Sequence, residues 1–317
     1  MSNNGRSSPD ILEQRPRRLS ARLRNSCMSI GAIVLIFGTM TIGEISAATA
    51  QSGSYAPRGP TKQQTQTIPG IAPAMESPVV TFAPTRLDGS SSIQLITTPS
   101  LSKLGTELIS SIRKTHREFN DLFGGITDIH NILRLIDAEE FYAVTHLPNW
   151  TNAMFFRKQV VIPIDRSKPI DRPELERSLR HEYFHAITHA LSAGRCPGWL
   201  DEGLAQHIEG VPQDGLWKAL SGWLGNNEMV PFERLGRGFT KLPGEMVAPA
   251  YAQSLVAARM VRSQFGMGAI RVFLERLKSG GKAENAFLHA FGIPPTAFHK
   301  RVEENLRAGK FRRGDFG

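Results

Sequence analysis

The sequence predicts an α+β fold in which a small N-terminal sheet precedes a largely helical C-terminal part. Short runs rich in β-branched residues lie between residues 79 and 164, are bounded by Gly, Pro or Asp, and indicate strands. After residue 173, apolar residues three and four positions apart indicate helices. Residues 79–308 are numerous enough for one sizeable core, or for two lobes beside a cleft. We therefore expect them to form the globular domain.

The expected elements follow one another in the order that these patterns give. A helix over 101–123 ends at Gly124-Gly125, and Pro163, which has no N–H for a ladder, indicates a strand end or an edge strand. The expected strands are 79–82, 93–97, 132–136 and 155–164. The stretch 213–250 is expected to be mostly loop, and the helices of a small C-terminal subdomain are expected at 251–265, 267–277, 283–291 and 295–306.

A predicted helix over 173–191 carries the most informative motif of the chain, H-E-x-x-H. Pro173 suits the first helical turn, and no Pro or Gly interrupts the residues that follow. Because residues four apart share one face of a helix, His181 and His185 point the same way. This spacing lets two ring nitrogens bind a single Zn²⁺.

Two glutamates supply what a hydrolytic zinc site further needs. Glu202 lies on a second helix that begins near Trp199, and it offers a third ligand beside His181 and His185. Three protein ligands leave one coordination position open, as hydrolytic zinc sites require. Glu182 can accept a proton from water at the metal. We therefore expect one Zn²⁺ per chain, with Glu182 as general base. Because H-E-x-x-H is short enough to occur by chance, the ordered context of the motif carries this prediction.

The motif H-E-x-x-H at 181–185, followed by W-L-x-E-G-x-A at 199–205, resembles the gluzincin zinc metallopeptidases, the thermolysin-like clan. The closest likeness is to small bacterial peptidase MA-like domains. The resemblance implies a thermolysin-like zincin fold and zinc-dependent peptide hydrolysis. Metzincins place Gly and His where this chain has Thr188 and Leu191, which disfavours that class. The implied roles are metal ligand for His181, His185 and Glu202, and general base for Glu182.

The same resemblance implies how substrate is held. Tyr251, at the start of the predicted helix 251–265, matches the tyrosine that donates a hydrogen bond to the oxyanion, an interaction that contributes a few kcal/mol. An edge strand over 155–162 would pair with an extended peptide through main-chain hydrogen bonds. Aminopeptidases of the clan hold the substrate amine with a carboxylate, and residues 152–156 contain none. We therefore expect an endopeptidase.

Three further residues have less specific roles. His189 lies about 12 Å along the helix axis from His181, at roughly 1.5 Å per residue, so we expect it to pack or to support the site. His207 is a weaker candidate than Tyr251 for the oxyanion donor. Cys196 is expected to be a small buried residue, because free cysteines are among the most buried residue types.

The first 50 residues are expected to be a secretory signal peptide or an N-terminal anchor. Residues 1–26 are basic, 28–43 carry no charge, and 48–50 read Ala-Thr-Ala, a cleavage pattern. The apolar run is shorter than the about 20 residues of a membrane span, yet a membrane tether through 28–43 stays open. We expect an exported protein, periplasmic or extracellular. Residues 51–78 are rich in Gln, Ser, Thr and Pro and are expected to be a disordered linker.

Charge and composition limit the classes of partner that we expect the chain to bind. The chain has a formal net charge of +9, and its tail at 309–317 is basic, a feature that suits either a solvated end or an anionic surface. It lacks a nucleic-acid motif and an aromatic–basic groove, so we expect a peptide or protein substrate and no nucleic acid. The oligomeric state is not fixed by the sequence. Two alternatives stay open: a non-catalytic, zinc-stabilised envelope or binding protein, and hydrolysis of a non-peptide amide.

Overall fold

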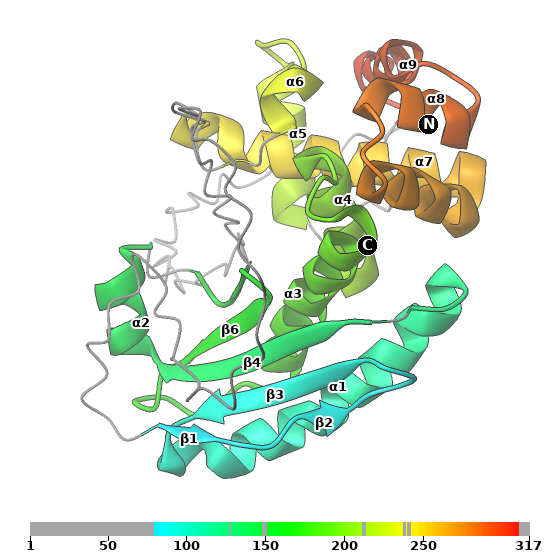
Figure 1. Cartoon of the computed structure of the whole chain (residues 1–317). Coiled ribbons are helices and arrows are strands. Elements are labelled where there is room, and N and C mark those ends of the chain that lie inside the picture. The colour runs from blue at the N-terminus through cyan, green and yellow to red at the C-terminus, as the bar shows by residue number, and fades with distance from the viewer. Residues whose placement is uncertain are drawn as a thin grey trace, which may run out of the picture. The chain divides into compact units, whose positions relative to one another are not determined.

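The computed structural model describes residues 79–126, 128–147, 151–210, 214–236, 239 and 242–310. These residues form a mixed α+β fold with one small sheet and a mostly helical remainder, as predicted (Figure 1). The predicted signal or anchor (1–50), the predicted linker (51–78) and most of the predicted tail lie outside the described residues. Of the helices described, none combines the length and the apolar character needed to cross a membrane.

Among the described residues, six strands form the sheet, in the order β1-β3-β4-β6-β5, with β2 also paired to β3. Strands β3, β4 and β6 run parallel, and β5 runs antiparallel to β6 at one edge. Strands β1 and β2 run antiparallel to β3 at the other end. The strands span β1 Val80–Thr81, β2 Thr85–Arg86, β3 Ser92–Thr97, β4 His130–Asp137, β5 Met154–Phe156 and β6 Gln159–Ile164.

Side chains alternate between the two faces of the sheet along each strand, so apolar side chains lie on both faces, and helices cover both. On one face, Leu133 and Val160 pack in the main core with α1 (Ser102–Phe123, preceded by η1 Pro99–Leu101) and α3 (Arg172–Ser192). On the other, Val161 and Met154 pack in a smaller cluster with Phe141 of α2 (Ala138–Thr145).

The remaining helices follow α3 in the chain, and α7 packs against α3, α4, α5 and α8. Helix α7 is interrupted at Gly266, whose φ of 75° and ψ of 171° are not helical, so the two helices predicted at 251–265 and 267–277 meet there. The six helices span α4 Gly198–Glu209, α5 Asp214–Leu224, α6 Phe232–Leu235, α7 Gly244–Lys278, α8 Ala283–Phe291 and α9 Pro295–Arg307.

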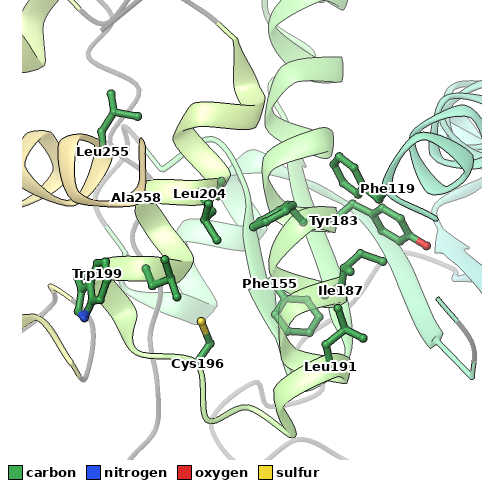
Figure 2. Packing of buried hydrophobic residues seen from close by; sticks show 14 of the residues in the cluster. Phe119, Phe155, Tyr183, Ile187, Leu191, Cys196, Trp199, Leu204, Leu255 and Ala258 are labelled. Atoms are coloured by element: carbon green, nitrogen blue, oxygen red, sulfur yellow. The ribbon is translucent and has the colours of Figure 1, made fainter. Parts of the chain in front are cut away.

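Tyr183 attaches α3 firmly to α1. Its ring stacks on Phe119 at 6.4 Å between centroids, and Figure 2 shows both rings between the two helices. Its hydroxyl lies 2.8 Å from Nδ1 of His116 in the same buried layer. Since Tyr183 stands between Glu182 and Phe184 within H-E-x-x-H, the motif is held by packing on the side of α3 that faces away from its histidines.

Three predictions about elements were wrong. The single strand predicted at 155–164 is a hairpin, in which β5 and β6 are joined by a turn at Arg157 and Lys158. The edge strand is therefore the short β5, and β6 lies inside the sheet. The turn was hidden because neither residue is the Gly or Asn that such turns favour.

The stretch predicted to be loop at 213–250 is partly helical, since it holds α5, α6 and the first turns of α7. Its glycines suggested breaks, but apolar side chains of α5 such as Leu216 and Leu220 are buried in the core, and burial outweighs propensity. The early start of α7 also means that Tyr251 lies inside a helix that begins at Gly244, and not at the start of a helix as predicted.

Candidate active site

The two histidines and the glutamate predicted as ligands meet at one point of the structure. His181 and His185 lie on α3, and Glu202 lies on α4, which packs against it. Glu202 Oε2 is 3.7 Å from His181 Nε2 and 3.9 Å from His185 Nε2. One ligand atom from each residue lies within 4.8 Å of the other two, and all three side chains are buried. This arrangement allows the three atoms to coordinate one ion.

The hydrogen bonding of these atoms fits a metal. Nε2 of both histidines and Oε2 of Glu202 are buried without a hydrogen-bond partner. Buried polar atoms in folded proteins almost always have one, so three unpartnered atoms at one point require an explanation. Two imidazole nitrogens and one carboxylate oxygen are a ligand set that Zn²⁺ takes in hydrolytic sites. The residues present therefore fit the predicted ion.

Two carboxylates that the sequence analysis did not single out stand behind the histidines. Nδ1 of His185 lies 3.0 Å from Asp201 Oδ2, and Nδ1 of His181 lies 3.3 Å from Glu209 Oε2. Thr188 Oγ1 in turn donates a hydrogen bond to Asp201. A carboxylate at Nδ1 keeps the proton on that nitrogen and leaves Nε2 free to bind a metal. The sequence feature that could have pointed to these two carboxylates is their spacing from Glu202. Asp201 directly precedes Glu202, and Glu209 follows it by two helical turns.

Replacing Asp201 with Asn is therefore expected to weaken zinc binding about 10- to 100-fold, the usual effect of removing such a supporting carboxylate. Competition with a chromophoric chelator measures the affinity. Asp165→Asn is the matched control, because Asp165 is exposed in the turn after β6 and pairs with its neighbours Ser167 and Lys168. An Asp201→Asn protein that binds zinc as tightly as the control would contradict a role for Asp201 in orienting His185.

The pKa values of His181 and of the adjacent Glu182 are both raised, but for different reasons. Burial acts to lower the pKa of His181, but Glu202 and Glu209 outweigh it and raise that pKa to about 10. Burial raises the pKa of Glu182 to about 7, against the influence of His185 and His181. Neither carboxylate oxygen of Glu182 has a hydrogen-bond partner of good geometry, although the side chain is fully buried. Glu182 is thus a carboxylate without a structural partner, next to the candidate metal ligands.

Tyr251 of α7 reaches the same site from a third helix. Burial raises the pKa of its phenol well above the usual value, and the charges of Glu202 and Glu182 raise it further. Those charges act on the phenol because it lies near both carboxylates. The ring rests edge-on against Phe239, with 4.6 Å between centroids. The structure therefore brings the predicted tyrosine to the predicted ligands.

The weaker candidates lie elsewhere or have packing roles. Both ring nitrogens of His207 contact arginines of α7: Nδ1 lies 3.2 Å from Arg259 Nε, and Nε2 contacts Arg262. Burial and these two charges lower the pKa of His207 to about 4, so it is engaged away from the ligands. His189 packs against Phe155 at 5.4 Å between centroids, as expected for a supporting residue. Cys196 is a buried free thiol, as predicted.

Gly203, next to Glu202, sets how closely α4 approaches α7. A Cβ atom at this position would lie 2.1 Å from the backbone oxygen of Ser254 and 2.7 Å from Cβ of Ala258. Figure 2 shows Ala258 and Leu204 where the two helices meet. The small residue in the W-L-x-E-G-x-A motif thus allows the contact that brings Glu202 and Tyr251 to one site.

Comparisons with known proteins give matches among solved structures only. No protein-family model and no curated protein matches the chain. It is similar to an M1 zinc metallopeptidase from Deinococcus radiodurans, with 17% identity and a TM-score of 0.44 over 73% of this chain and 51% of that one. It is also similar to Legionella pneumophila aminopeptidase A in complex with aspartic acid, with 14% identity and a TM-score of 0.44 over 71% of this chain and 28% of that one.

An aminopeptidase N family protein from Idiomarina loihiensis matches with 11% identity and a TM-score of 0.38, over 72% of this chain and 42% of that one. The chain spans about half the length, or less, of these structures. Of these three structures, the first is named a zinc metallopeptidase and the other two are named aminopeptidases. Likeness at this level says nothing of the activity of this chain, which depends on the side chains of its own site.

Proposed function

We propose that this protein is a zinc metallopeptidase with a thermolysin-like arrangement of its site. The observation that carries the proposal is the meeting of three buried, unpartnered ligand atoms with the equally unpartnered carboxylate of Glu182. A purely structural zinc site is normally closed by four protein ligands, whereas three leave a position for water or substrate. His181, His185 and Glu202 would hold the ion.

The chain's own residues supply the proton transfers. Bound zinc would act as a Lewis acid toward the peptide carbonyl and would lower the pKa of water beside it. Glu182 accepts the proton of the attacking water and later donates it to the leaving amine, in the two successive roles of a general base and a general acid. Tyr251 donates a hydrogen bond to the carbonyl oxygen as negative charge develops there. Asp201 and Glu209 keep the two imidazoles in the tautomer that leaves Nε2 free.

Tyr251→Phe is expected to lower kcat about 100-fold with little change in KM, because the lost hydrogen bond forms mainly in the transition state. Zinc content and the melting temperature should stay as in the wild type, since the phenyl ring retains its contact with Phe239. Steady-state kinetics on a quenched fluorescent peptide measures both constants. A kcat within threefold of the wild-type value would remove Tyr251 from the mechanism.

The proposal is tested directly with the purified full-length chain, by measuring zinc per chain and cleavage of a quenched peptide library. We expect about one zinc, cleavage that a chelator abolishes, and recovery when zinc is added back. Zinc without cleavage of any peptide would favour the zinc-stabilised binding protein. Failure to bind zinc would overturn the proposal altogether.

We further propose that cleavage is internal to the peptide. No carboxylate occurs among residues 152–156 around the edge strand β5, where one would be needed to hold a free substrate amine at that edge. Blocked peptides with an N-terminal acetyl group should therefore be cleaved as well as free ones. Cleavage restricted to the free peptides would instead assign an aminopeptidase.

Export, with or without a membrane tether at residues 28–43, is part of the same proposal and is tested by fractionation of cells.

A further inference from the structure

The edge strand β5 lies against α3, the helix that carries H-E-x-x-H. Within the described residues β5 pairs with β6 alone, through Met154 with Val161, Phe155 with Val160 and Phe156 with Gln159. In a hairpin with a two-residue turn, the residues on either side of the turn, here Phe156 and Gln159, form a hydrogen-bonded pair. Hydrogen-bonded and non-hydrogen-bonded pairs then alternate along the antiparallel ladder, so the next pair, Phe155 and Val160, is not hydrogen-bonded. The N–H and C=O of Phe155 therefore point away from β6. The ring of Phe155 contacts His189 of α3, one turn beyond His185, with 5.4 Å between centroids, so this part of β5 lies beside the helix of the candidate ligands.

The turn that ends β5 places two cations at this edge in an unfavourable backbone conformation. Arg157 and Lys158 have φ values of 48° and 65°, in the left-handed region. Asn and Gly adopt these angles at little cost, whereas Arg and Lys do not. Strained residues of this kind persist where the surrounding structure or a function holds them. The sequence thus keeps two long basic side chains at a position where a shorter, uncharged pair would suit the fold better.

Neither cation is neutralised within the described part of the chain. Both side chains are exposed, and no acidic residue forms an ion pair with either of them. The guanidinium of Arg157 lies over the ring of Phe156, 5.2 Å from its centroid, which holds it along the strand. The strand that this turn ends packs against α3, the helix that carries the candidate ligands. The end of β5 is therefore an unneutralised basic site next to the catalytic residues.

We propose that the Arg157-Lys158 turn binds an acidic side chain, Asp or Glu, of the peptide substrate on the N-terminal side of the cleaved bond. This inference rests on the proposed function and names its substrate class. A peptide that extends the sheet by antiparallel pairing runs opposite to β5, so its N-terminal residues lie at the turn. Arg157 lies two positions after Phe155, a distance of about 6.6 Å along a strand. The acidic residue therefore lies about two positions before the residue opposite Phe155.

The test measures peptide binding to a protein that does not cleave. Acetylated hexapeptides with Glu or Gln at one position at a time are titrated against the zinc-loaded Glu182→Gln variant, with fluorescence anisotropy as the readout. We expect Glu to strengthen binding about fivefold over Gln at N-terminal positions only, as exposed ion pairs allow. This preference should shrink at about 0.5 M salt, where the screening length falls to a few ångströms.

A second variant separates recognition from folding. Arg157→Asn with Lys158→Gly introduces the pair that this turn favours, so the melting temperature should rise while the preference for Glu disappears. Lys103→Gln is the matched control, because it removes a charge from an exposed position of α1, a helix that packs on β3 toward the other end of the sheet. This variant should keep the preference.

Equal binding of Glu and Gln peptides, or binding of neither, would overturn the acidic subsite. A preference confined to C-terminal positions, or one that survives in the double variant, would overturn it too. Cleavage of the library by the wild-type protein decides separately on the proposed function, so the subsite can fail while the peptidase stands. Zinc-loaded wild-type protein that cleaves no peptide removes the function itself.

Discussion

Replacing Glu182 with Gln is expected to lower kcat about 1,000-fold while zinc binding and folding stay unchanged. Gln has the size and shape of Glu but cannot accept a proton, and general acid–base groups contribute about 100- to 10,000-fold to rate. The carboxylate has no hydrogen-bond partner of good geometry to lose, so the amide should cause little structural disturbance. Zinc analysis, circular dichroism and turnover of a cleaved library peptide measure the three properties on one preparation.

The matched control for this variant is Glu176→Gln, on the same helix but at an exposed position where the carboxylate accepts a hydrogen bond from Ser111. It should keep wild-type turnover. A Glu182→Gln protein that retains turnover within tenfold of the wild type would exclude Glu182 as the general base. Loss of both zinc and turnover would instead show that Glu182 is needed to build the site.

Gly203→Ala is the second substitution with a large expected effect, about 3 kcal/mol of lost stability. Its new methyl group would collide with the backbone oxygen of Ser254, and backbone cannot rotate away as a flexible side chain can. Overpacking of a well-packed core costs about 1–3 kcal/mol, and contact with backbone belongs at the upper end. Since α4 must move to relieve the clash, Glu202 should shift from the two histidines and zinc affinity should fall.

Urea unfolding of the variant, with and without zinc, measures both effects. Gly222→Ala provides the comparison, because Gly222 lies in α5 with open space around the position of a new Cβ. That variant should gain about 0.5–1 kcal/mol, since Ala favours an exposed helix more than Gly does. If Gly203→Ala instead proved as stable and as tight for zinc as the wild type, the close contact between α4 and α7 would not be what positions Glu202.

Much of this site could be predicted from sequence because its residues lie at short, regular spacings. Two histidines four apart on an uninterrupted helix must share a face, and the structure confirms that His181 and His185 do so. Glu202 follows on the next helix after a turn marked by Gly and Pro, and it meets them as predicted. The long helix α1 and the strands β3 and β4 were predicted for the same reason, since each has strong local periodicity.

What could not be predicted depends on contacts between distant segments. Glu209 supports His181 only because α4 lies against α3: its spacing from Glu202 gives the shared helix face, but not the contact with the other helix. The left-handed turn at Arg157 and Lys158 carries no turn residue, so two strands were taken for one. The start of α7 was missed because the glycines of 213–250 suggested a loop, whereas the helix begins at Gly244 and continues through Pro249 into a buried segment.

The shortness of β5 has a consequence for how the protein behaves at high concentration. An open sheet edge that accepts an extended peptide can also accept the edge of a second molecule, the first step toward ordered aggregates. Natural proteins discourage this with very short edge strands and with lysines at the edge. β5 has three residues and ends at Arg157 and Lys158, so two copies brought edge to edge would repel each other and gain few hydrogen bonds. The same charges that we propose attract an acidic peptide would thus keep the protein from pairing with itself.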